Sequence, residues 1–520
     1  MPAPHLHPRP AVPAPRADRR RPALAATAVA ALLGLVGVAA APAALAASEP
    51  QTLTVERIQP VAGPALSGSG PNEETTEVSV VGTGFTAAST VLVGGEAVAT
   101  ELESSTLLTA QVPRRGPGTA DVTVTDGDDT TPVVPAARFT WTGVVGTPAV
   151  RVLENRGPGT RCVDVRTAAD LPSDADGVFL NVTAADATGV GYVVVRPGPD
   201  GTAPAPFPEP TGSTVNLEPG RDVANSAYVP VSPDGEICYT AVGGAVRVLL
   251  DVTGYTVPGS GVTGAPSTRL LDTRPGGVGE IEGPVPPRTV QTVQVAGVAG
   301  VPEDASSVLL NVTVTGIAAV GNLRVFPGGQ DVPSTSVVNY APGADKANAT
   351  TVALEDGTVS FWSDTFEPTS TNPVQVILDV VGWTSADSDV TAIAPTRVLD
   401  TRTRTGAIPH PLFARTGYSL PVTQGGAVPE GATAVILNVT AIHPSSVGNL
   451  RVYPDYLGTG GGAPVPGSVL NYIGGRDIPN QVVVPLPPNG RVTLYNDMFS
   501  GSTEAAVDVV GYVLNAERRG

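Results

Sequence analysis

One pattern occurs three times along the chain, and it constrains the fold more than any other feature of the sequence. Each copy opens with Arg-x-Leu-(Asp/Glu)-x-Arg, continues with a Leu-Asn-Val-Thr string and closes on Asp-Val-x-Gly followed by an aromatic residue. The copies run from Arg151 to Tyr255, from Arg269 to Trp383 and from Arg397 to Tyr512. Because such self-similarity is typical of tandem structural units, we expect three domains with one fold and loops of different length.

Apolar and polar side chains alternate within each copy, as is typical of β-strands. In 307–315, for example, three valines and Leu310 fall on one face, whereas Leu309, Asn311 and two threonines fall on the other. The 60 glycines and 53 prolines lie between such stretches, as expected for turns. Helical periodicity is nearly absent, so we predict an all-β chain in which each copy is a β-sandwich or jelly-roll-like domain.

The segment at residues 51–143 precedes the copies and has its own pattern of short strands and glycine turns. It resembles the IPT/TIG family of immunoglobulin-like domains in the motifs Ile58-x-Pro60, Gly82-x-Gly84-Phe85, Val91-x-Val93-Gly94-Gly95 and Gly116-Pro117-Gly118. The resemblance implies a small antiparallel sandwich. For a secreted bacterial protein it also implies a spacer or adhesion module without enzyme activity.

The copies resemble a tandem module of secreted proteins from high-GC Gram-positive (actinobacterial) bacteria in their Leu-Asp-Thr-Arg and Leu-Asn-Val-Thr strings. Copy one departs from this pattern, with Glu154-Asn155 in place of Asp-Thr. We therefore predict an immunoglobulin-like sandwich followed by three tandem β-sandwich or jelly-roll-like repeats. The expected boundaries are 1–46 for a signal peptide, 51–143 for the IPT/TIG domain, and 148–256, 266–384 and 394–515 for the repeats.

The first 46 residues have the features of a secretory signal. A basic region at 16–21 precedes an apolar stretch at 24–40, and Ala44-Leu45-Ala46 fits a cleavage site. General and twin-arginine export both stay open. No later stretch is long and apolar enough to span a membrane, and a formal net charge of −18 argues against nucleic acid or an anionic membrane as partner. We expect a secreted, extracellular protein, with cell-wall association open.

Both cysteines of the chain, Cys162 and Cys238, lie in copy one. In an oxidising compartment, a pair within one domain is most simply a disulfide. Two cysteines without a supporting histidine do not make a metal site. We predict a Cys162–Cys238 disulfide that stabilises copy one by about 4 kcal/mol if its geometry is unstrained.

The recurring acidic and basic residues permit two interpretations. Asp272 and Asp379 are a conceivable carboxylate pair for glycoside hydrolysis. In the favoured, structural interpretation, the arginine that ends each opening motif pairs with the aspartate of each closing motif. These pairs are Arg156 with Asp251, Arg274 with Asp379, and Arg402 with Asp508. We predict structural roles for the repeated residues Asp272, Arg274, Asp379, Asp400, Arg402, Asp508, Asn311 and Asn438.

Asparagines recur at fixed places in each copy. Asn181, Asn311 and Asn438 lie inside predicted strands, where an amide is costly unless the backbone of a neighbouring loop satisfies it. A second set precedes a glycine by four residues, as in a fixed turn. This second set is Asn216, Asn339 and Asn471. Asn-Val-Thr is formally a glycosylation sequon, but a position inside a strand argues against its use.

Residues suited to catalysis or metal binding are scarce. His410 and His443 occur in copy three alone, without a Gly-x-Ser-x-Gly motif or a catalytic cysteine, and we expect them at the surface. The sequence contains no phosphate-binding loop and no His/Cys/carboxylate cluster, so we expect no cofactor and no enzyme activity. The acidic loop at 126–129 matches no EF-hand spacing and is interpreted as a solvated turn, with calcium binding left open.

Copies two and three share aromatic and polar residues that copy one lacks. Such residues suit a sugar-binding surface, since rings stack on sugar C–H faces and polar groups bind hydroxyls. The alternative is core or edge packing, and exposure of the rings on one face would separate the two. The candidates are Phe326, Tyr453, Tyr340, Tyr472, Trp362, Tyr495, Asn322, Asn449, Arg324 and Arg451.

These observations favour a secreted, non-catalytic protein that acts as a binding, adhesion or presentation module at the bacterial surface. The expected partner is a cell-wall glycan or a surface protein. A carbohydrate- or wall-binding accessory role, a glycan-active enzyme and a structural spacer stay as alternatives. The sequence does not indicate the oligomeric state.

Overall fold

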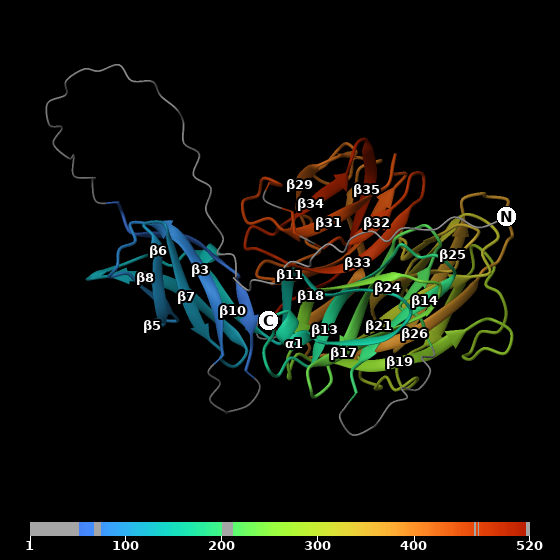
Figure 1. The fold of residues 1–520 in the computed structure, drawn as a ribbon, viewed down its shortest axis with the longest axis horizontal. Helices are drawn as coiled ribbons and strands as arrows, with labels where there is room; N and C mark the ends of the chain where they lie inside the picture. Colours follow the sequence, from blue (N-terminus) through green and yellow to red (C-terminus); the bar gives the residue numbers. More distant parts are fainter. Residues whose placement is uncertain (1–50, 67–73, 200–211, 462–463, 466, 516–520) are drawn as a thin grey trace, which may run out of the picture. The chain divides into compact units, whose positions relative to one another are not determined.

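The computed structural model describes residues 51–66, 74–199, 212–461, 464–465 and 467–515. The predicted signal peptide lies outside these residues. Within them almost every element is a β-strand, and the strands form four pairs of sheets (Figure 1). This confirms the predicted all-β fold of an immunoglobulin-like sandwich followed by repeats. In the part of the chain that is described, no helix has the length and apolar character of a membrane span.

The first pair of sheets forms the immunoglobulin-like sandwich. One sheet has the order β1-β3-β7-β6, and the other has the order β2-β10-β8-β4-β5 with β9 paired to β8. Buried side chains such as Val78, Val91 and Phe139 fill the space between them. Its elements are β1 (Thr54–Gln59), β2 (Ala62–Pro64), β3 (Thr75–Thr83), β4 (Thr90–Val93), β5 (Glu96–Ala97), β6 (Ala99–Ser104), β7 (Leu107–Pro113), β8 (Gly118–Asp126), β9 (Asp129–Thr130), the 3-10 helix η1 (Pro135–Ala137) and β10 (Arg138–Thr142).

Each repeat copy consists of two sheets with the same strand order in all three copies. We name the sheet that contains the Leu-Asn-Val-Thr strand the axial sheet, and the other the outer sheet. The axial sheets are, in spatial order, β11 (Val144–Arg156), β18 (Arg247–Thr256), β13 (Gly177–Ala185) and β16 (Val223–Pro230) in copy one; β19 (Val262–Asp272), β26 (Gln375–Thr384), β21 (Ser307–Thr315) and β24 (Lys346–Ala353) in copy two; and β27 (Val390–Asp400), β35 (Ser502–Val513), β30 (Ala434–Ile442) and β33 (Ile478–Pro485) in copy three, where β28 (Leu412–Phe413) also pairs with β35.

The outer sheets close the three sandwiches. They are β12 (Gly159–Asp164), β17 (Glu236–Gly243), β14 (Gly191–Pro197) and β15 (Val215–Leu217); β20 (Val290–Gln294), β25 (Thr358–Thr365), β22 (Gly321–Pro327) and β23 (Val338–Tyr340); and β29 (Thr416–Pro421), β34 (Arg491–Met498), β31 (Gly448–Pro454) and β32 (Leu470–Tyr472). Copy one adds a short helix, α1 (Val165–Ala168), whose N-cap Asp164 accepts a hydrogen bond from the Thr167 amide.

Alternate residues of the Leu-Asn-Val-Thr strand face two different cores. In copy two, Val308 and Leu310 belong to the core inside the sandwich. Leu309 belongs instead to a separate apolar cluster that draws on all three copies. Both faces of this strand are therefore buried, which an isolated sandwich with one solvated face would not show.

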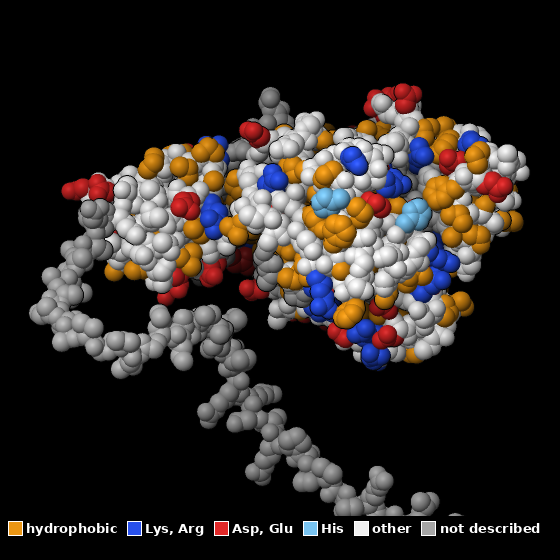
Figure 2. Space-filling model, turned by 90° about the horizontal axis from the view of Figure 1, so that it is seen from above, with side chains coloured by type: hydrophobic (Ala, Val, Ile, Leu, Met, Phe, Trp, Pro, Cys, Tyr) orange, Lys and Arg blue, Asp and Glu red, His pale blue; other side chains and the backbone are white. Residues whose placement is uncertain are grey.

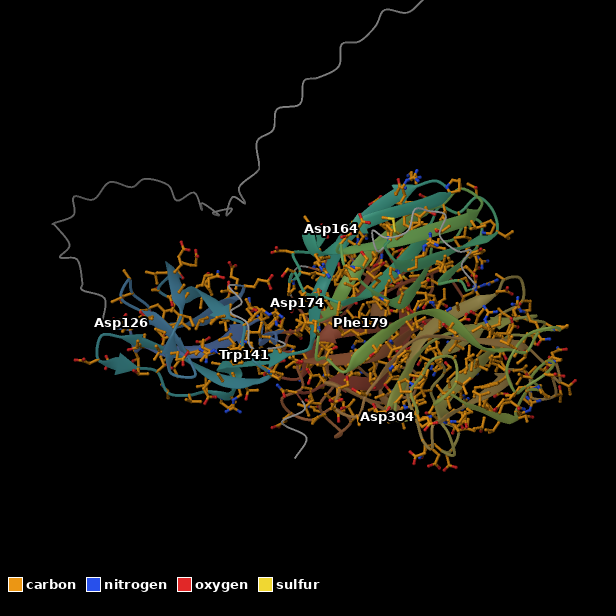
Figure 3. All side chains as sticks on the ribbon, turned by 90° about the horizontal axis from the view of Figure 1, so that it is seen from below. Asp126, Trp141, Asp164, Asp174, Phe179 and Asp304 are labelled. Carbon is orange, nitrogen blue, oxygen red and sulfur yellow. A yellow bond between two sulfur atoms is a disulfide. The ribbon has the colours of Figure 1, made fainter. Side chains whose placement is uncertain are left out.

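The edge strands β16, β24 and β33 of the three axial sheets contact one another, and we call the line along which they meet the axis. Figure 1 shows β24 and β33 side by side. The apolar cluster at the axis includes one residue from the same strand position in each copy: Phe179, Leu309 and Ile436. Figure 3 places Phe179 where ribbons from different copies meet. Burying three sheet edges against each other removes the exposed backbone that makes edge strands prone to aggregation.

Strand asparagines join the copies into a closed ring. The Nδ2 of Asn311 donates to the carbonyl oxygen of Ser213 at 2.7 Å, and Asn438 donates to Ser336 at 2.8 Å. Asn181 completes the cycle with a 2.6 Å bond to the carbonyl oxygen of Ser468. Copy two thus contacts copy one, copy three contacts copy two, and copy one contacts copy three. A neighbouring loop satisfies each amide, as the sequence suggested, but the loop belongs to another copy.

The predicted arginine–aspartate pairs are wrong, because each closing aspartate pairs with a different arginine from the one predicted. The first arginine of each opening motif, not the last, pairs with the closing aspartate: Arg269 Nε lies 2.6 Å from Asp379 Oδ1, Arg397 Nε lies 2.7 Å from Asp508 Oδ1, and Arg151 pairs with Asp251. The cause is strand register, because Arg269 sits directly opposite Asp379 in the β19–β26 ladder. The arginines named in the prediction pair elsewhere: Arg156 with Asp186, Arg274 with Asp272, and Arg402 with Asp400.

The predicted disulfide is confirmed. Cys162 on β12 lies directly opposite Cys238 on β17, and the two sulfurs are bonded. It crosslinks neighbouring strands of the outer sheet of copy one, a place where copies two and three have no cysteine.

Polar contacts also connect the immunoglobulin-like sandwich to the copies. The buried Arg114 donates to both carboxylate oxygens of Asp174 in copy one, at 2.8 and 2.9 Å. Thr142 Oγ1 and the Gly143 amide both donate to Asp389 Oδ2, at the start of copy three. Such bidentate and charge-assisted bonds fix orientation as well as adding stability.

Candidate functional site

Three equivalent loops meet at one end of the axis and enclose a pocket of about 380 Å³, which we call the axial pocket. They connect β15 to β16, β23 to β24 and β32 to β33. The polar and charged side chains that line the pocket are Asn216, Glu218, Arg221, Asp222 and Asn225 from copy one, Asn339, Tyr340, Asp345 and Lys346 from copy two, and His443, Asn471, Arg476 and Asp477 from copy three. No single copy provides the pocket, so it exists only because the ring closes.

The local sequence explains why these loops share one conformation. A glycine four residues after the turn asparagine takes a positive φ in each copy, at +71° for Gly220, +114° for Gly343 and +73° for Gly475. Only glycine adopts this region without steric cost. Two residues later, an aspartate anchors the loop: Asp222 accepts a hydrogen bond from the Asp186 amide and Asp477 accepts one from the His443 amide.

An ion-paired glutamate lies in the wall of the pocket. Glu218 is 5% exposed, and it pairs with Arg221 at 2.7 Å and with Lys346 of copy two. Burial acts to raise the pKa of Glu218, but the two cations outweigh it and the pKa is lowered. Burial lowers the pKa of Lys346, and the ion pair with Glu218 opposes that shift. The pair therefore stays charged and links copy one to copy two.

Arg476 differs from the other cations of the axial pocket. It is half-buried, and among residues 51–66, 74–199, 212–461, 464–465 and 467–515 no carboxylate forms an ion pair with it. The equivalent residue of copy one, Arg221, is paired with Glu218, and copy two has Ala344 at this position. The pocket thus has one guanidinium without a carboxylate partner in the described part of the chain.

Apolar side chains border the axial pocket. Its walls include Val223, Ile473 and Ile478, and its rim includes Val320 at 48% and Phe366 at 55% exposure. Figure 2 shows a face of the molecule on which histidine, basic and apolar side chains gather. Apolar walls with a few placed polar groups are typical of small-molecule binding sites.

The predicted glycan surface does not form as proposed. Phe326, Tyr340, Tyr453 and Tyr472 are all 5% exposed or less. Within the sandwich, the Tyr340 hydroxyl donates to the carbonyl oxygen of Asp364 and shares a hydrogen bond with the Ser363 hydroxyl. The Tyr472 hydroxyl donates to Oδ1 of Asn496. Phe326 and Tyr453 lie on β22 and β31, which pack against β27 and β11 of the adjoining copies. These four rings do not form an exposed surface, because they fill the cores and the interfaces between copies, although Tyr340 also borders the axial pocket.

The other members of that set are also engaged with the protein. Trp362 is half-buried, and the Arg324 guanidinium lies 4.5 Å from the centre of its ring. Arg324 also donates to the Asn322 side chain and to the carbonyl oxygen of Pro333. Arg451 pairs with Asp497, and Tyr495 and Asn449 are half-buried beside it on the outer sheet of copy three. Among the Phe, Tyr and Trp side chains that the structure describes, the exposed rings are Phe366, Phe413 and Phe499.

The repeated carboxylates pair with arginines, and Asp272 and Asp379 are not arranged as a catalytic pair. Burial raises the pKa of Asp379, with Arg269 opposing the shift, whereas the hydrogen bond from Arg274 lowers the pKa of Asp272 to about 2. Arg269 bonds to both carboxylates and so occupies the space between them. A hydrolytic pair needs that space for the scissile bond.

The remaining predictions fall away from the axial pocket or at its margin. His410 is exposed and packs against Phe413 and Tyr418. His443 is exposed at the pocket margin, 3.9 Å from Asp477. Asp126 accepts hydrogen bonds from Thr86 and Ser89. Among the described residues, no three His, Cys, Asp or Glu side chains are grouped so as to hold a metal ion.

Sequence reasoning missed the residues that give the axial pocket its charge. No role was predicted from the sequence for Lys346, the single lysine of the chain, or for Glu218 and Arg476. One signal was available: the loop after the turn asparagine repeats in all copies, yet Glu218, Ala341 and Ile473 occupy one position of it. Differences inside a repeated loop mark places where the copies have separate roles.

Comparison with known proteins identifies one part of the chain. Residues 54–140 match the model of the IPT/TIG domain family, which confirms the resemblance seen in that segment. A search of curated proteins finds no match.

Solved structures with partial likeness share little sequence with this chain. They include SGBP-B from a complex xyloglucan utilization locus in Bacteroides uniformis, with 10% identity over 65% of this chain and 73% of that chain and a TM-score of 0.15. The SGBP-B of a Bacteroides ovatus mixed-linkage glucan utilization locus has 12% identity, 60% and 72% coverage, and a TM-score of 0.15. With TM-scores of 0.15, these superpositions establish neither a shared fold nor a shared function.

Proposed function

We propose that this chain is a secreted, non-catalytic binding protein of the bacterial cell surface, and that the axial pocket holds its ligand. One observation carries the proposal: three copies of a domain bring charged groups, asparagine amides and an exposed apolar rim to a single cavity. A cavity of this size and character suits a small polar molecule or the end of a chain. A cell-wall glycan is the partner we favour.

The lining supports binding in preference to catalysis. Glu218 is held by two cations, and Asp222 and Asp477 are bonded to loop amides. A general acid or base needs a carboxyl group free to exchange a proton with substrate. The asparagines at equivalent positions of the three copies offer neutral donors and acceptors, which suit hydroxyl groups.

A variant that fills the axial pocket tests the proposal. Ala341 lines the pocket at the position where the other copies have Glu218 and Ile473, so this place accepts a larger side chain. We expect Ala341→Trp to abolish co-sedimentation of the mature protein with purified cell wall or insoluble polysaccharide. Val133→Trp adds the same ring at an exposed site of the immunoglobulin-like sandwich and serves as the control.

Two results would contradict the proposal. In the first, the wild-type protein binds and Ala341→Trp, still folded by circular dichroism, binds equally well. In the second, the wild-type protein pellets with none of the wall or polysaccharide samples, and a spacer role then becomes the better account.

A further inference from the structure

We propose that the axial pocket selects a ligand that carries a carboxylate on a sugar-like ring, and that Arg476 binds this carboxylate. The inference rests on the proposed function, because it names the ligand class of the same pocket. It follows from the way the three copies differ at the axis.

The three equivalent loop positions at the axis do not all carry the same side chain. Copy one has Arg221, which Glu218 neutralises at 2.7 Å; copy two has Ala344; copy three has Arg476, which pairs with no carboxylate in the described part of the chain. The ring is therefore symmetric in its backbone and asymmetric in its charge. One anion site results, not three.

Three cations line the axial pocket: Arg221, Lys346 and Arg476. Within the described residues, Arg221 and Lys346 both pair with the same carboxylate, Glu218, so these two cations and Arg476 exceed the paired negative charge. Arg476 also acts on Lys346, since its charge contributes to the lowered pKa of that lysine. A bound anion beside Arg476 would relieve this repulsion.

Three carboxylates besides Glu218 also line the axial pocket. Asp345 and Asp477 lie in the electrostatic fields of Arg274 and Arg402, outside the pocket. Asp222 is exposed and bonded to the Asp186 amide. With His443 neutral, the lining has four carboxylates against three cations, a formal charge of −1, so a ligand with one negative charge fits better than a phosphate dianion. The planar guanidinium of arginine also matches a carboxylate in a two-point contact.

The axial pocket has room for more than a carboxylate group. The cavity of about 380 Å³ is much larger than a carboxylate alone, and Asn216, Asn339 and Asn471 line it together with Ile473 and Ile478. Amides bind hydroxyls, while aliphatic side chains and the Phe366 ring suit the C–H face of a sugar. A uronic acid, which joins a carboxylate to a pyranose ring, has all of these features.

The single lysine of the chain provides a direct test. Because Lys346 is the only lysine, a protein labelled with 13C at lysine Cε has one side-chain NMR signal, and it originates in the axial pocket. We would titrate this sample with D-glucuronate, with D-glucose and with inorganic phosphate. The expected result is a saturable shift with glucuronate and at least about tenfold weaker binding of glucose, as expected for loss of one charge-assisted bond.

Two variants make the test specific to Arg476. Arg476→Gln should weaken glucuronate binding about tenfold or more and leave glucose binding unchanged. Arg161→Gln, at an exposed position of copy one, is the matched control and should bind as the wild type does. Equal binding of glucose and glucuronate, tighter binding of phosphate, or full glucuronate affinity in Arg476→Gln would each overturn the inference.

The same experiments separate failure of this inference from failure of the proposed function. If glucuronate causes no shift while Ala341→Trp still abolishes wall binding, the pocket binds a ligand of another class. If both results are negative, the pocket is not the binding site.

Discussion

The side-chain amide of Asn480 donates to Oδ1 of Asn181 at 2.9 Å, although 299 positions separate the two residues. The same bond joins Asn225 to Asn311 at 2.9 Å and Asn348 to Asn438 at 3.3 Å. In each case an asparagine of one copy meets the strand asparagine of the next. The bond between Asn480 and Asn181 is the one that returns from copy three to copy one and closes the ring.

Removing that bond should destabilise the protein. In Asn480→Ala, the buried Oδ1 of Asn181 loses its hydrogen-bond donor. The backbone amide of Ser226 loses its acceptor, the Oδ1 of Asn480, which lies 2.9 Å away in the wild type. We expect a loss of about 1–3 kcal/mol in the free energy of unfolding, measured by denaturant titration. Asn372→Ala, at an exposed loop position, should change it by no more than about 0.5 kcal/mol. Equal stability of the two variants would contradict a structural role for the ring.

Breaking a repeated ion pair should lower the free energy of unfolding more than Asn480→Ala does. Arg397→Ala leaves Asp508, which is 1% exposed, without its partner, and a loss of about 3–5 kcal/mol is expected. Burial raises the pKa of Asp508, with Arg397 opposing the shift. Protonation therefore favours the folded state, so the deficit should shrink as the pH falls through the folded-state pKa of this group.

The control for this variant is Arg138→Ala. It removes a pair with Asp121 in which both side chains are more than one-third exposed, and it should cost less than about 1 kcal/mol. A deficit in Arg397→Ala that grows at acidic pH would contradict the assignment.

Asp272 should show the opposite pH dependence. Its pKa falls from 3.8 to about 2 through the hydrogen bond from Arg274, so it contributes stability above pH 3.8 that is lost as the pH falls toward 2. At pH 7 we expect Asp272→Asn to be less stable than the wild type by about 1–2 kcal/mol. Denaturant titrations at a series of pH values should show the two proteins converging near pH 2. A difference independent of pH would be inconsistent with this pKa.

Reduction of the disulfide should weaken copy one. The bond spans a sequence separation of 76, and a loop of that length corresponds to about 4 kcal/mol by chain-entropy arguments. We expect the double variant Cys162→Ser/Cys238→Ser to unfold at lower temperature than the oxidised protein. Added reductant should lower the melting temperature of the wild type and leave that of the double variant unchanged. A wild type insensitive to reductant would count against a stabilising role.

The sequence predicted the sandwiches because alternation and turn residues act locally. Val308 and Leu310 lie in the sandwich core as their pattern indicates. The opposite face of the strand, with Leu309 and Asn311, has apolar and polar residues in the sequence, and in the structure it is buried as well. This face is buried by the neighbouring copies, and the sequence around Asn311 does not indicate which loop accepts the hydrogen bond of its side chain.

The arginine–aspartate pairing and the axial pocket were not predicted from the sequence, for related physical reasons. The opening motif contains two arginines, and the choice between Arg269 and Arg274 depends on the register of β19 against β26, which a bulge between Arg269 and Leu271 alters. The axial pocket was missed because its charged residues come from three distant loops. Glu218 and Lys346 become a pair only when β16 and β24 meet at the axis.

Amide hydrogen exchange of the edge strands tests the ring most directly. In an isolated sandwich β16, β24 and β33 would each have one unpaired edge, and amides such as those of Ser226 and Ala349 would exchange with solvent. In the ring these two amides donate to Asn480 and Asn225 of other copies. The account predicts slow exchange of both amides in the wild type and faster exchange of Ser226 in Asn480→Ala. Fast exchange of both amides in the wild type would show that the copies are separate domains and would contradict the ring.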